Sequence, residues 1–452
     1  MKAIVVGGGL AGLGAAYRLH KNGWEVTVLE ADEEVGGRAK MIERNGYSIP
    51  TGATQVSTGY HDYIALCKEL GVDDDFVAGS NMVSLIRDGK LYEIDGTKPL
   101  TVALTGALSL RSKYLIARSM MEMRAMEPKL SPLDMSANHA VDDGRTAKDF
   151  AMERMNQQSY DVLVDPLMRA CTLNRGDAVS ALEWFSALST LGGVKFITLR
   201  GGVQRLSHLL AAKVDTRVNA RVTDVKRTTG GVEVNFTQDG VPQSLTADAC
   251  VLATRLPEAV EMSEEMAEVA KPLASRIEYN RGFLVHLGYS VKPKTRSVGV
   301  MVPTVENPYI ALIWLEHNKG EDDITPPGHG LFTVYFDEAA LDDVKSGSDE
   351  EYGKIAADYL EKLYPELKGH QDMMAVSRWN LAIPHPTPGH YRAVNEMKGR
   401  IDPAGPIQLA GDYFTTTGQN SAIHWGQRAA DNIIKHIGRR NAPAESLAEL
   451  KA

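Results

Sequence analysis

The stretch AIVVGGGLAGLGAAYRLHKNGWEVTVLE, residues 3–30, decides the fold. Its first four residues form a short apolar run, which is typical of a buried parallel strand. Residues 13–20 then predict a helix, and residues 25–29 predict a second strand. Between the first strand and the helix lies Gly7-Gly8-Gly9-Leu10-Ala11-Gly12, a G-x-G-x-x-G pattern. In this strand–turn–helix–strand context the pattern predicts a dinucleotide-binding unit.

The glycines of this pattern have separate roles. Gly7 allows the tight turn from strand to helix, Gly9 lets a diphosphate approach the backbone, and Gly12 lets helix and strand pack closely. The start of the helix offers free N–H groups and the positive end of its dipole to phosphates. Glu30 ends the second strand, 18 residues after Gly12. A carboxylate there accepts hydrogen bonds from ribose hydroxyls and disfavours a 2′-phosphate, so the expected ligand is FAD or NAD.

The composition of the 452-residue chain is that of an ordinary globular protein, with 43% hydrophobic and 24% charged residues. Its length predicts two or three domains. The net charge of −9 argues against a protein that binds nucleic acid through a basic surface. No apolar run in the sequence reaches the ~18 residues that a membrane-spanning helix needs.

The three cysteines, Cys67, Cys171 and Cys250, are far apart and odd in number. This pattern excludes a disulfide framework and a cysteine-rich zinc site. The sequence shows no other spacing of metal ligands, so we expect no metal. Free thiols fit a reducing compartment, which predicts a cytoplasmic protein.

A second glycine pair follows Glu30, because the segment EADEEVGGR, residues 30–38, ends in Gly36-Gly37-Arg38. An ordinary NAD-binding unit lacks this feature. The segment resembles the FAD-dependent amine oxidase superfamily, which includes monoamine oxidases, protoporphyrinogen oxidases and phytoene-desaturase-like enzymes. The most specific match is IQLAGDYFTTTGQNSAIHWGQRAA, residues 407–430, and residues 164–184 are similar to the protoporphyrinogen oxidase group in particular. Other matching segments lie at residues 47–55, 200–206, 218–225 and 249–257.

The resemblance implies an α/β fold class, with a discontinuous Rossmann-like FAD-binding domain and an inserted α+β substrate domain. The expected FAD-binding domain comprises residues 1–60, 196–265 and 392–440. The expected substrate domain comprises residues 61–195 and 266–391, and residues 441–452 form a C-terminal tail. The sequence pattern predicts mostly helices between about residues 60 and 195, and strands between about 275 and 390.

The resemblance also implies which residues hold FAD. Arg38 is expected to neutralise the diphosphate as a forked donor, and Asp412 to bind the ribityl chain. The last helix is expected to direct its N–H groups at the pyrimidine edge of the flavin, where its dipole favours the negative charge of reduced flavin. Pro50 stands where the family often has an acid. The expected cofactor-binding residues are Gly7, Gly9, Leu10, Ala11, Gly12, Glu30, Ala31, Gly37, Arg38, Gly52, Ala53, Thr54, Val222, Gly411, Asp412, Ser421, Ala422 and Ile423.

Three features of monoamine oxidases are absent from the sequence. The loop of residues 378–391 has no cysteine for covalent attachment, so FAD is expected to bind non-covalently. Alignment with the family places Phe283 where those enzymes have a lysine, and Gln419 where they have an aromatic-cage tyrosine. These departures favour hydride transfer to the flavin from a small to medium cyclic or conjugated substrate, with C–C or C–N desaturation. The candidate catalytic residues are Gln419, Trp379 and His385.

Other interpretations of the sequence stay open. The alternatives are a flavin amine oxidase, a non-redox flavin-dependent isomerase and a flavin-binding scaffold without chemistry. The electron acceptor, O2 or a quinone, and the oligomeric state are also open. Residues 101–126 interleave long apolar, Met-rich runs with arginine and lysine. This pattern predicts helices that either pack over a substrate tunnel or contact a membrane peripherally.

Overall fold

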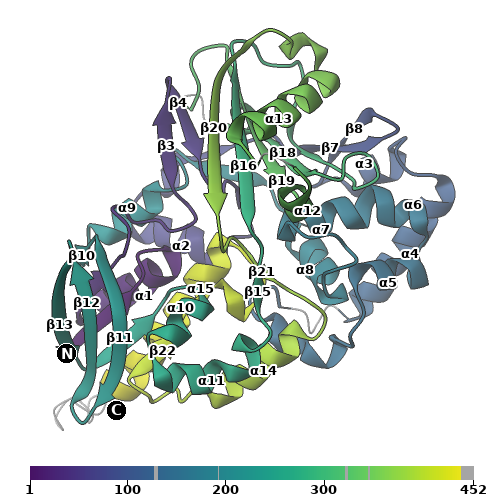
Figure 1. The fold of residues 1–452 in the computed structure, drawn as a ribbon. Coiled ribbons are helices and arrows are strands. Elements are labelled where there is room, and N and C mark those ends of the chain that lie inside the picture. The colour runs from purple at the N-terminus through teal and green to yellow at the C-terminus, as the bar shows by residue number, and fades with distance from the viewer. Residues whose placement is uncertain (127–130, 192, 321–323, 345–346, 439–452) are drawn as a thin grey trace.

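A five-stranded parallel sheet at one end of the molecule combines strands from distant parts of the chain (Figure 1). The structure is a computed structural model that describes residues 1–126, 131–191, 193–320, 324–344 and 347–438. In spatial order the strands are β10 (Asp215–Arg217), β2 (Glu25–Leu29), β1 (Lys2–Val6), β14 (Ala249–Leu252) and β22 (Ile407–Leu409). The central strands have the buried apolar residues that a parallel sheet covered on both faces requires.

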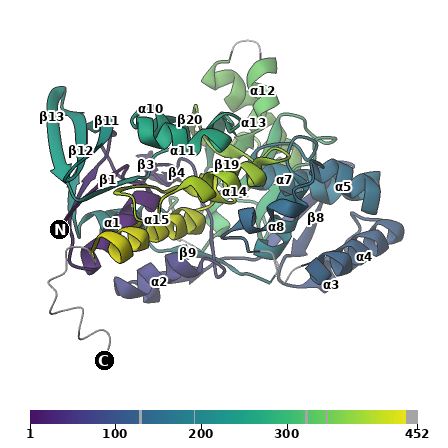
Figure 2. The ribbon, with the colours of Figure 1, turned by 90° about the horizontal axis from the view of Figure 1, so that it is seen from below.

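Two helices pack against each other on one face of this sheet. α1 (Leu10–Lys21) begins three residues before the predicted helix, directly after Gly9. α15 (Gln419–Ile433) lies beside α1 in both views (Figures 1 and 2). A Cβ atom at Gly426 would lie 2.0 Å from the carbonyl oxygen of Ala11. Only glycine at position 426 therefore permits this approach of the two helices.

The other face of the sheet carries a second apolar core under three helices. These helices are α10 (Leu256–Glu261), α11 (Glu264–Ala274) and α14 (His390–Arg400). A three-stranded antiparallel sheet, which packs into the same core, consists of β11 (Ala220–Thr228), β12 (Gly231–Gln238) and β13 (Val241–Ala247). Helices on both faces give the parallel sheet its α/β architecture.

A seven-stranded, mostly antiparallel sheet forms the other half of the molecule. Its strands, in spatial order, are β20 (Gln371–Trp379), β16 (Gly282–Tyr289), β19 (Gly330–Phe336), β18 (Ile310–Leu315), β17 (Ser297–Met301), β7 (Met82–Arg87) and β8 (Lys90–Asp95). α13 (Asp349–Leu363) packs on one face, against a core that includes Phe283 and Val285 of β16. Because strand residues alternate between faces, Leu284 belongs to a different cluster on the other face.

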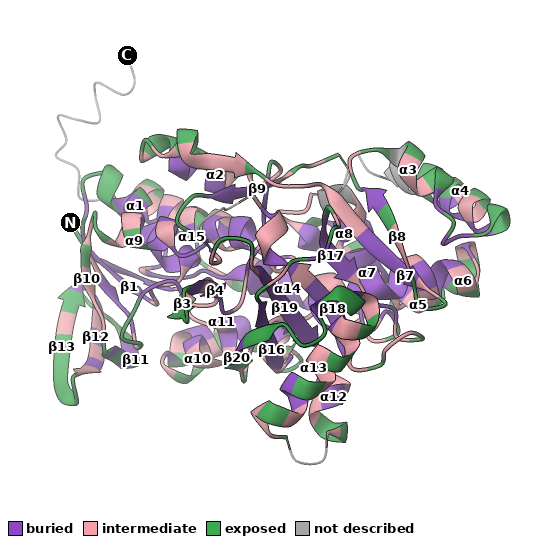
Figure 3. Ribbon diagram, turned by 90° about the horizontal axis from the view of Figure 1, so that it is seen from above, coloured by how far each residue is buried: buried purple, intermediate pink, exposed green. Residues whose placement is uncertain are grey.

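The helices between residues 99 and 191 lie beyond the seven-stranded sheet (Figure 3). They are α3 (Pro99–Leu104), α4 (Leu110–Met126), α5 (Ala147–Arg154), α6 (Gln157–Ser159), α7 (Asp165–Thr172) and α8 (Ala181–Leu191). The prediction that residues 60–195 are mostly helical misses β7 and β8. β7 pairs with β17, which is far away in sequence, and β8 pairs with β7. Among the described residues, no helix combines the length and apolar character that crossing a membrane requires.

Several short elements connect the two halves. A three-stranded sheet contains β5 (Val56–Ser57), β9 (Phe196–Leu199) and β6 (Phe76–Ala78). β3 (Met41–Arg44) and β4 (Tyr47–Pro50) form an antiparallel pair, and β15 (Glu278–Tyr279) and β21 (Pro384–His385) form another. The remaining α-helices of the described residues are α2 (His61–Glu69), α9 (Arg205–Ala211) and α12 (Glu338–Asp343). These connections place the turn after β4 at the junction of the two sheets.

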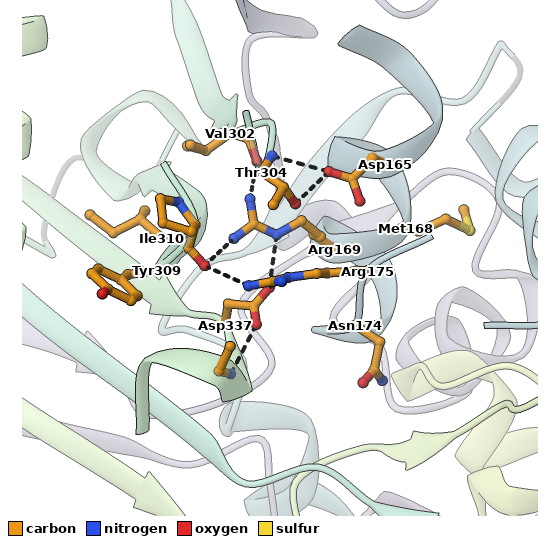
Figure 4. A network of polar contacts seen from close by, with 12 residues as sticks. Asp165, Met168, Arg169, Asn174, Arg175, Val302, Thr304, Tyr309, Ile310 and Asp337 are labelled. Carbon is orange, nitrogen blue, oxygen red and sulfur yellow. Dashed lines mark hydrogen bonds and ion pairs between the residues drawn. The ribbon is translucent and has the colours of Figure 1, made fainter. Parts of the chain in front are cut away.

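A fully buried arginine ties the helical region to the seven-stranded sheet (Figure 4). Arg169 of α7 donates to the Asp337 carboxylate over 2.9 Å and to the Val302 carbonyl over 2.7 Å. Arg175 lies 3.5 Å from the same carboxylate and is one-third exposed. Because the charge of Arg169 is compensated and its donors are satisfied, the network joins two insertions of the chain at one point.

Candidate functional site

The glycine turn after β1 leaves no room for side chains except at its tip. Gly7 has φ +104°, and a Cβ atom there would lie 2.9 Å from the Ala253 carbonyl oxygen. A Cβ atom at Gly12 would lie 1.9 Å from the carbonyl oxygen of Gly7. At Gly9 the nearest neighbour of such an atom is Gly37 Cα at 3.9 Å. The backbone at the start of α1 is therefore open at Gly9, which is the cradle that a diphosphate needs.

Glu30 lies beside this turn, directly after β2, and is 9% exposed. One carboxylate oxygen accepts a hydrogen bond from the Gly8 amide over 2.6 Å, and the other accepts from the Asp32 amide over 2.9 Å. These bonds fix the carboxylate in the position that the sequence predicts for ribose recognition. Each oxygen retains a lone pair for a hydroxyl donor.

Arg38 links three segments of the chain. Its guanidinium donates to the Asp412 carboxylate over 2.9 Å and to the Ala382 carbonyl over 2.7 Å. Burial lowers the pKa of Arg38, but the Asp412 carboxylate more than offsets this effect and the pKa is raised above its usual value. The loop before Arg38 is tied to the glycine turn, because the Gly36 amide donates to the Gly8 carbonyl over 2.9 Å. The loop that carries the Arg38 cation is therefore held against the glycine turn.

The turn of residues 51–55 is held from the seven-stranded sheet. The Tyr335 hydroxyl donates to the Gly52 carbonyl, and the Trp379 indole N–H donates to the Thr51 carbonyl, both over 2.7 Å. A Cβ atom at Gly52 would lie 2.3 Å from the Arg38 carbonyl oxygen. Trp379 therefore lies at the site, but its N–H is occupied in positioning the turn.

Gln419 begins α15 and is 5% exposed. Its amide nitrogen donates to the Gln55 carbonyl over 3.0 Å. The side-chain oxygens of Gln419 and Gln55 are both buried and have no hydrogen-bond partner among the described residues. A buried acceptor without a donor is costly, so these two oxygens fit a ligand that brings N–H groups. This is the observation by which a flavin fits the chain.

The remaining predicted cofactor residues lie on the elements that meet here. Leu10 and Ala11 form the first turn of α1, Ala31 follows Glu30, and Ala53 and Thr54 lie in the turn held by Tyr335. Gly411 and Asp412 follow β22, and Ser421, Ala422 and Ile423 lie in the first turns of α15. Val222 lies in β11, next to a bulge in its pairing with β12. Two of these residues bond directly to Arg38: the Asp412 carboxylate accepts from its guanidinium over 2.9 Å, and the Ala53 amide donates to its carbonyl over 2.8 Å.

His385 is less closely connected to this arrangement. Its ring contacts the Ala178 carbonyl at 3.2 Å and lies 3.7 Å from the Glu278 carboxylate. Burial lowers its pKa, so the ring is neutral at physiological pH. His390 and His286 are buried more deeply, and burial lowers the pKa of each to about 3. No bond among the described residues joins any of these rings to Gln419.

The alignment that put Phe283 in the place of the amine-oxidase lysine is off by one residue. Phe283 packs under α13, with its ring 4.1 Å from the ring of Tyr352. Leu284 points to the opposite face and packs in a cluster with Tyr335 and Trp379, the residues that hold the turn of residues 51–55. The alternation of side chains along β16 explains the difference. The position next to the site is thus apolar.

Two buried acids at the site were missed by the sequence reasoning. Glu316 pairs with Lys319 over 2.6 Å, and the Lys319 ammonium also donates to the Thr54 hydroxyl over 2.6 Å. Glu183 accepts hydrogen bonds from the hydroxyls of Tyr391 and Thr416. Glu183 lies within residues 164–184, which resemble the protoporphyrinogen oxidase group, but no motif singled out either acid. Glu316 and Lys319 are three residues apart, whereas long-range packing brings Thr54 to Lys319, and Tyr391 and Thr416 to Glu183.

Comparison with known proteins places the chain among flavoenzymes. The sequence model of the family described as "Flavin containing amine oxidoreductase" matches residues 10–434. Protoporphyrinogen oxidase 2 of Arabidopsis thaliana is 22% identical over 96% of this chain and 94% of that protein. Coproporphyrinogen III oxidase of Bacillus subtilis is 23% identical over 96% of this chain and 98% of that protein. Cyclohexylamine oxidase from Brevibacterium oxydans has the same fold, with a TM-score of 0.78 and 18% identity over 97% and 99% of the two chains.

Proposed function

The chain belongs to the family of flavin containing amine oxidoreductases and is a flavin-dependent oxidoreductase, and on this premise we propose that it binds FAD non-covalently and oxidises a cyclic or conjugated substrate by hydride transfer. The observation that carries the proposal is the pair of buried, unpartnered amide oxygens of Gln419 and Gln55 beside an apolar wall. The flavin would supply the hydride acceptor.

The chain's own residues divide the binding of FAD among them. The open backbone at Gly9 and the start of α1 suit the diphosphate, and Arg38 adds a cation on the same side. Glu30 suits the adenosine ribose, and Asp412 suits the ribityl hydroxyls. The start of α15 suits the pyrimidine edge. These roles would assemble the FAD-binding domain from residues 1–60, 196–265 and 392–440.

Non-covalent binding is supported by the cysteines of the chain. None lies in the loop of residues 378–391. Cys67 and Cys250 are fully buried in the cores on the two faces of the parallel sheet. Burial raises the pKa of the Cys67 thiol, and that of Cys171, to about 12. A thiol that does not ionise is a poor nucleophile.

The substrate we propose is a ring that carries N–H donors, and a porphyrinogen is the first candidate. Leu284, Tyr335 and Trp379 form an apolar wall beside the turn of residues 51–55. These wall residues carry no carboxylate to pair with an ammonium group, whereas the Gln419 oxygen accepts from a neutral N–H. In such an oxidation a meso C–H bond of the porphyrinogen would release a hydride to the bound flavin, and a pyrrole N–H would lose its proton to water. The electron pair left by the N–H bond would complete the new conjugated double bond, so that the pyrrole nitrogen ends as a C=N imine. The reoxidant, O2 or a quinone, would act as a second substrate.

An anaerobic flavin-bleaching assay tests this proposal. Coproporphyrinogen III, protoporphyrinogen and cyclohexylamine would each be mixed with the FAD-loaded protein, and flavin reduction followed by absorbance. We expect bleaching by a porphyrinogen and none by cyclohexylamine. Fast bleaching by the amine alone would replace the proposal with amine oxidation. Acid precipitation of the same protein should release all of the flavin into the supernatant, and colour retained in the pellet would contradict non-covalent binding.

We further propose that α3 and α4 bind an anionic lipid surface. Leu104, Leu110 and Tyr114 are 65–85% exposed, and Arg111 and Lys113 accompany them on α4 (Figure 3). Exposed apolar side chains beside cations suit the interface of a membrane that carries negative charge.

Flotation with vesicles of phosphatidylcholine, with and without phosphatidylglycerol, tests the lipid surface. We expect binding that needs phosphatidylglycerol and is lost in the Leu104→Glu/Leu110→Glu variant. Val241→Glu, which alters an apolar residue on β13 that is 59% exposed, is the control and should bind as wild type. Equal flotation of all three proteins would contradict the proposal.

A further inference from the structure

Glu183 is a buried acid whose two oxygens are bonded to two different parts of the chain. It lies in the first turn of α8 and is 2% exposed. The hydroxyl of Tyr391, in α14, donates to one oxygen. The hydroxyl of Thr416 donates to the other over 3.3 Å. Thr416 lies in the loop that leads from Asp412 to Gln419 and is only partly buried, so Glu183 touches the segment that joins two proposed flavin contacts.

No cation compensates this acid among the described residues. Asp142, just before α5, adds a like charge that raises the pKa of Glu183 further, and it accepts bonds from the Ser180 hydroxyl and from the Gly389 and Tyr391 amides over 2.9–3.0 Å. The Cys171 thiol of α7 faces Glu183, and burial raises the pKa of that thiol to about 12.

The charged side chains of the other neighbouring elements are engaged elsewhere. At α5, Arg145 pairs with Asp143 and Glu153, and Asp149 caps the helix at Thr146. In the segment before Asp142, the His139 ring contacts the Ser136 carbonyl over 2.9 Å. Burial therefore dominates and raises the pKa of Glu183 to about 7, although the Thr416 bond opposes it.

We propose that Glu183 is a positioning residue whose protonation state sets the direction of the Thr416 hydroxyl in the loop that leads into α15. When Glu183 is ionised both oxygens accept, so the Thr416 hydroxyl donates to it. When Glu183 is protonated it carries a hydrogen of its own, and one neighbouring hydroxyl becomes the acceptor. Tyr391 is fully buried, whereas Thr416 is not, so the change falls on Thr416 and frees its hydrogen for another acceptor.

The consequence for the flavin deepens the proposed function and rests on it. Protonation of Glu183 would free the hydrogen of the Thr416 hydroxyl to donate toward the start of α15, where reduced flavin would carry its negative charge. The midpoint potential of the bound flavin should therefore fall more steeply with pH around neutrality in the wild type than in Glu183→Gln. At pH 6 the two proteins should have similar potentials, and at pH 8 the variant should have the higher one.

The apoprotein provides a second readout that does not need the flavin. An acid whose folded-state pKa is raised above its unfolded value binds more protons when folded, so the stability of the protein decreases as pH rises from about 4.5 to about 7. Glu183→Gln has no such ionisation. The urea midpoint of the variant relative to wild type should therefore increase between pH 5 and pH 8.

Thr416 variants separate the positioning role from simple burial. In Thr416→Val the loop loses its bond to Glu183. The extra pH dependence of the flavin midpoint potential, the step in potential, should therefore disappear. The pH dependence of the urea midpoint, the urea step, should persist and move to higher pH. Thr416→Ser keeps the hydroxyl and should restore the step in potential. Asp161→Asn removes another acid whose pKa is raised by burial and which accepts a bond from Gln157, and its flavin potential should depend on pH as in wild type.

The outcomes distinguish failure of this inference from failure of the proposed function. If the urea midpoint of Glu183→Gln still falls with pH as in wild type, another group titrates. If the step in flavin potential persists in Thr416→Val, the loop plays no part. Either result overturns the inference. If Glu183→Gln does not fold, the comparison of Thr416→Val with Thr416→Ser decides. If FAD does not bind, the proposed function fails, and the urea data still test the ionisation.

Discussion

Arg38 and Asp412 are 374 positions apart in the sequence, and their side chains are joined by an ion pair of 2.9 Å. The same guanidinium holds the Ala382 carbonyl over 2.7 Å. One side chain thus connects the loop after β2, the end of β22 and the segment after β20. In the proposed binding mode a diphosphate at Gly9 would share this guanidinium with Asp412, so we expect cofactor binding and the docking of these segments to be coupled.

Arg38→Lys should weaken FAD binding more than a simple loss of charge predicts. Lysine keeps the charge but lacks the planar fork whose separate nitrogens reach Asp412 and Ala382. Asp412, whose side chain is 5% exposed, would keep a poorer partner, and we expect a loss of about 1–3 kcal/mol of apoprotein stability. Flavin-fluorescence titration and urea unfolding measure the two effects. Arg217→Lys, at an exposed ion pair with Asp215, is the control, and equal behaviour of both variants would refute the coupling.

Arg169→Ala should destabilise the protein by about 3–5 kcal/mol, because it leaves the Asp337 carboxylate buried without its main partner. Urea unfolding at pH 7 measures this. Arg175→Ala, which removes a one-third exposed guanidinium 3.5 Å from the same carboxylate, should change the stability by less than about 1 kcal/mol. Similar losses in both variants would mean that the network shown in Figure 4 is not centred on Arg169.

Gln419→Leu should slow flavin reduction by the true substrate, at a cost of about 1–3 kcal/mol in transition-state binding. The leucine removes both the unpartnered oxygen and the bond to the Gln55 carbonyl. The rate is measured in protein saturated with FAD. Glu30→Ala should instead weaken FAD binding and leave the rate of the saturated enzyme near that of wild type. An unchanged rate in Gln419→Leu would remove this residue from the substrate site.

Gly12→Ala should abolish FAD binding, because the added carbon would lie 1.9 Å from the Gly7 carbonyl oxygen. The turn must open to admit it, and the cradle at Gly9 opens with it. Gly399→Ala is the matched control, since the added carbon meets nothing within 4 Å and the residue lies in α14. That change should stabilise the protein by up to about 1 kcal/mol. Retention of yellow colour by purified Gly12→Ala would contradict the expected role of the turn.

Local patterns in the sequence were enough to predict the unit of residues 3–30, including the turn and the position of Glu30. The pairing of β7 with β17 could not be predicted, because the register of a strand depends on partners elsewhere in the chain. The placement of Phe283 failed by one residue for a related reason: a slip of one position in a strand reverses the face. Glu183 has ordinary neighbours in sequence, and only burial beside Tyr391 and Thr416 makes it unusual.

The order of strands in the parallel sheet has a consequence for the newly made protein. About 400 residues separate Gly9 from β22, yet β1 and β22 belong to one sheet, and α15 packs on α1 through Gly426. At ~5–20 residues per second this separation is roughly 20–80 s of translation. During that interval the face of α1 that packs against α15 lacks its partner. The parallel sheet and the α1–α15 pair can therefore be completed only after β22 and α15 have been made, and chaperones have that long to intervene.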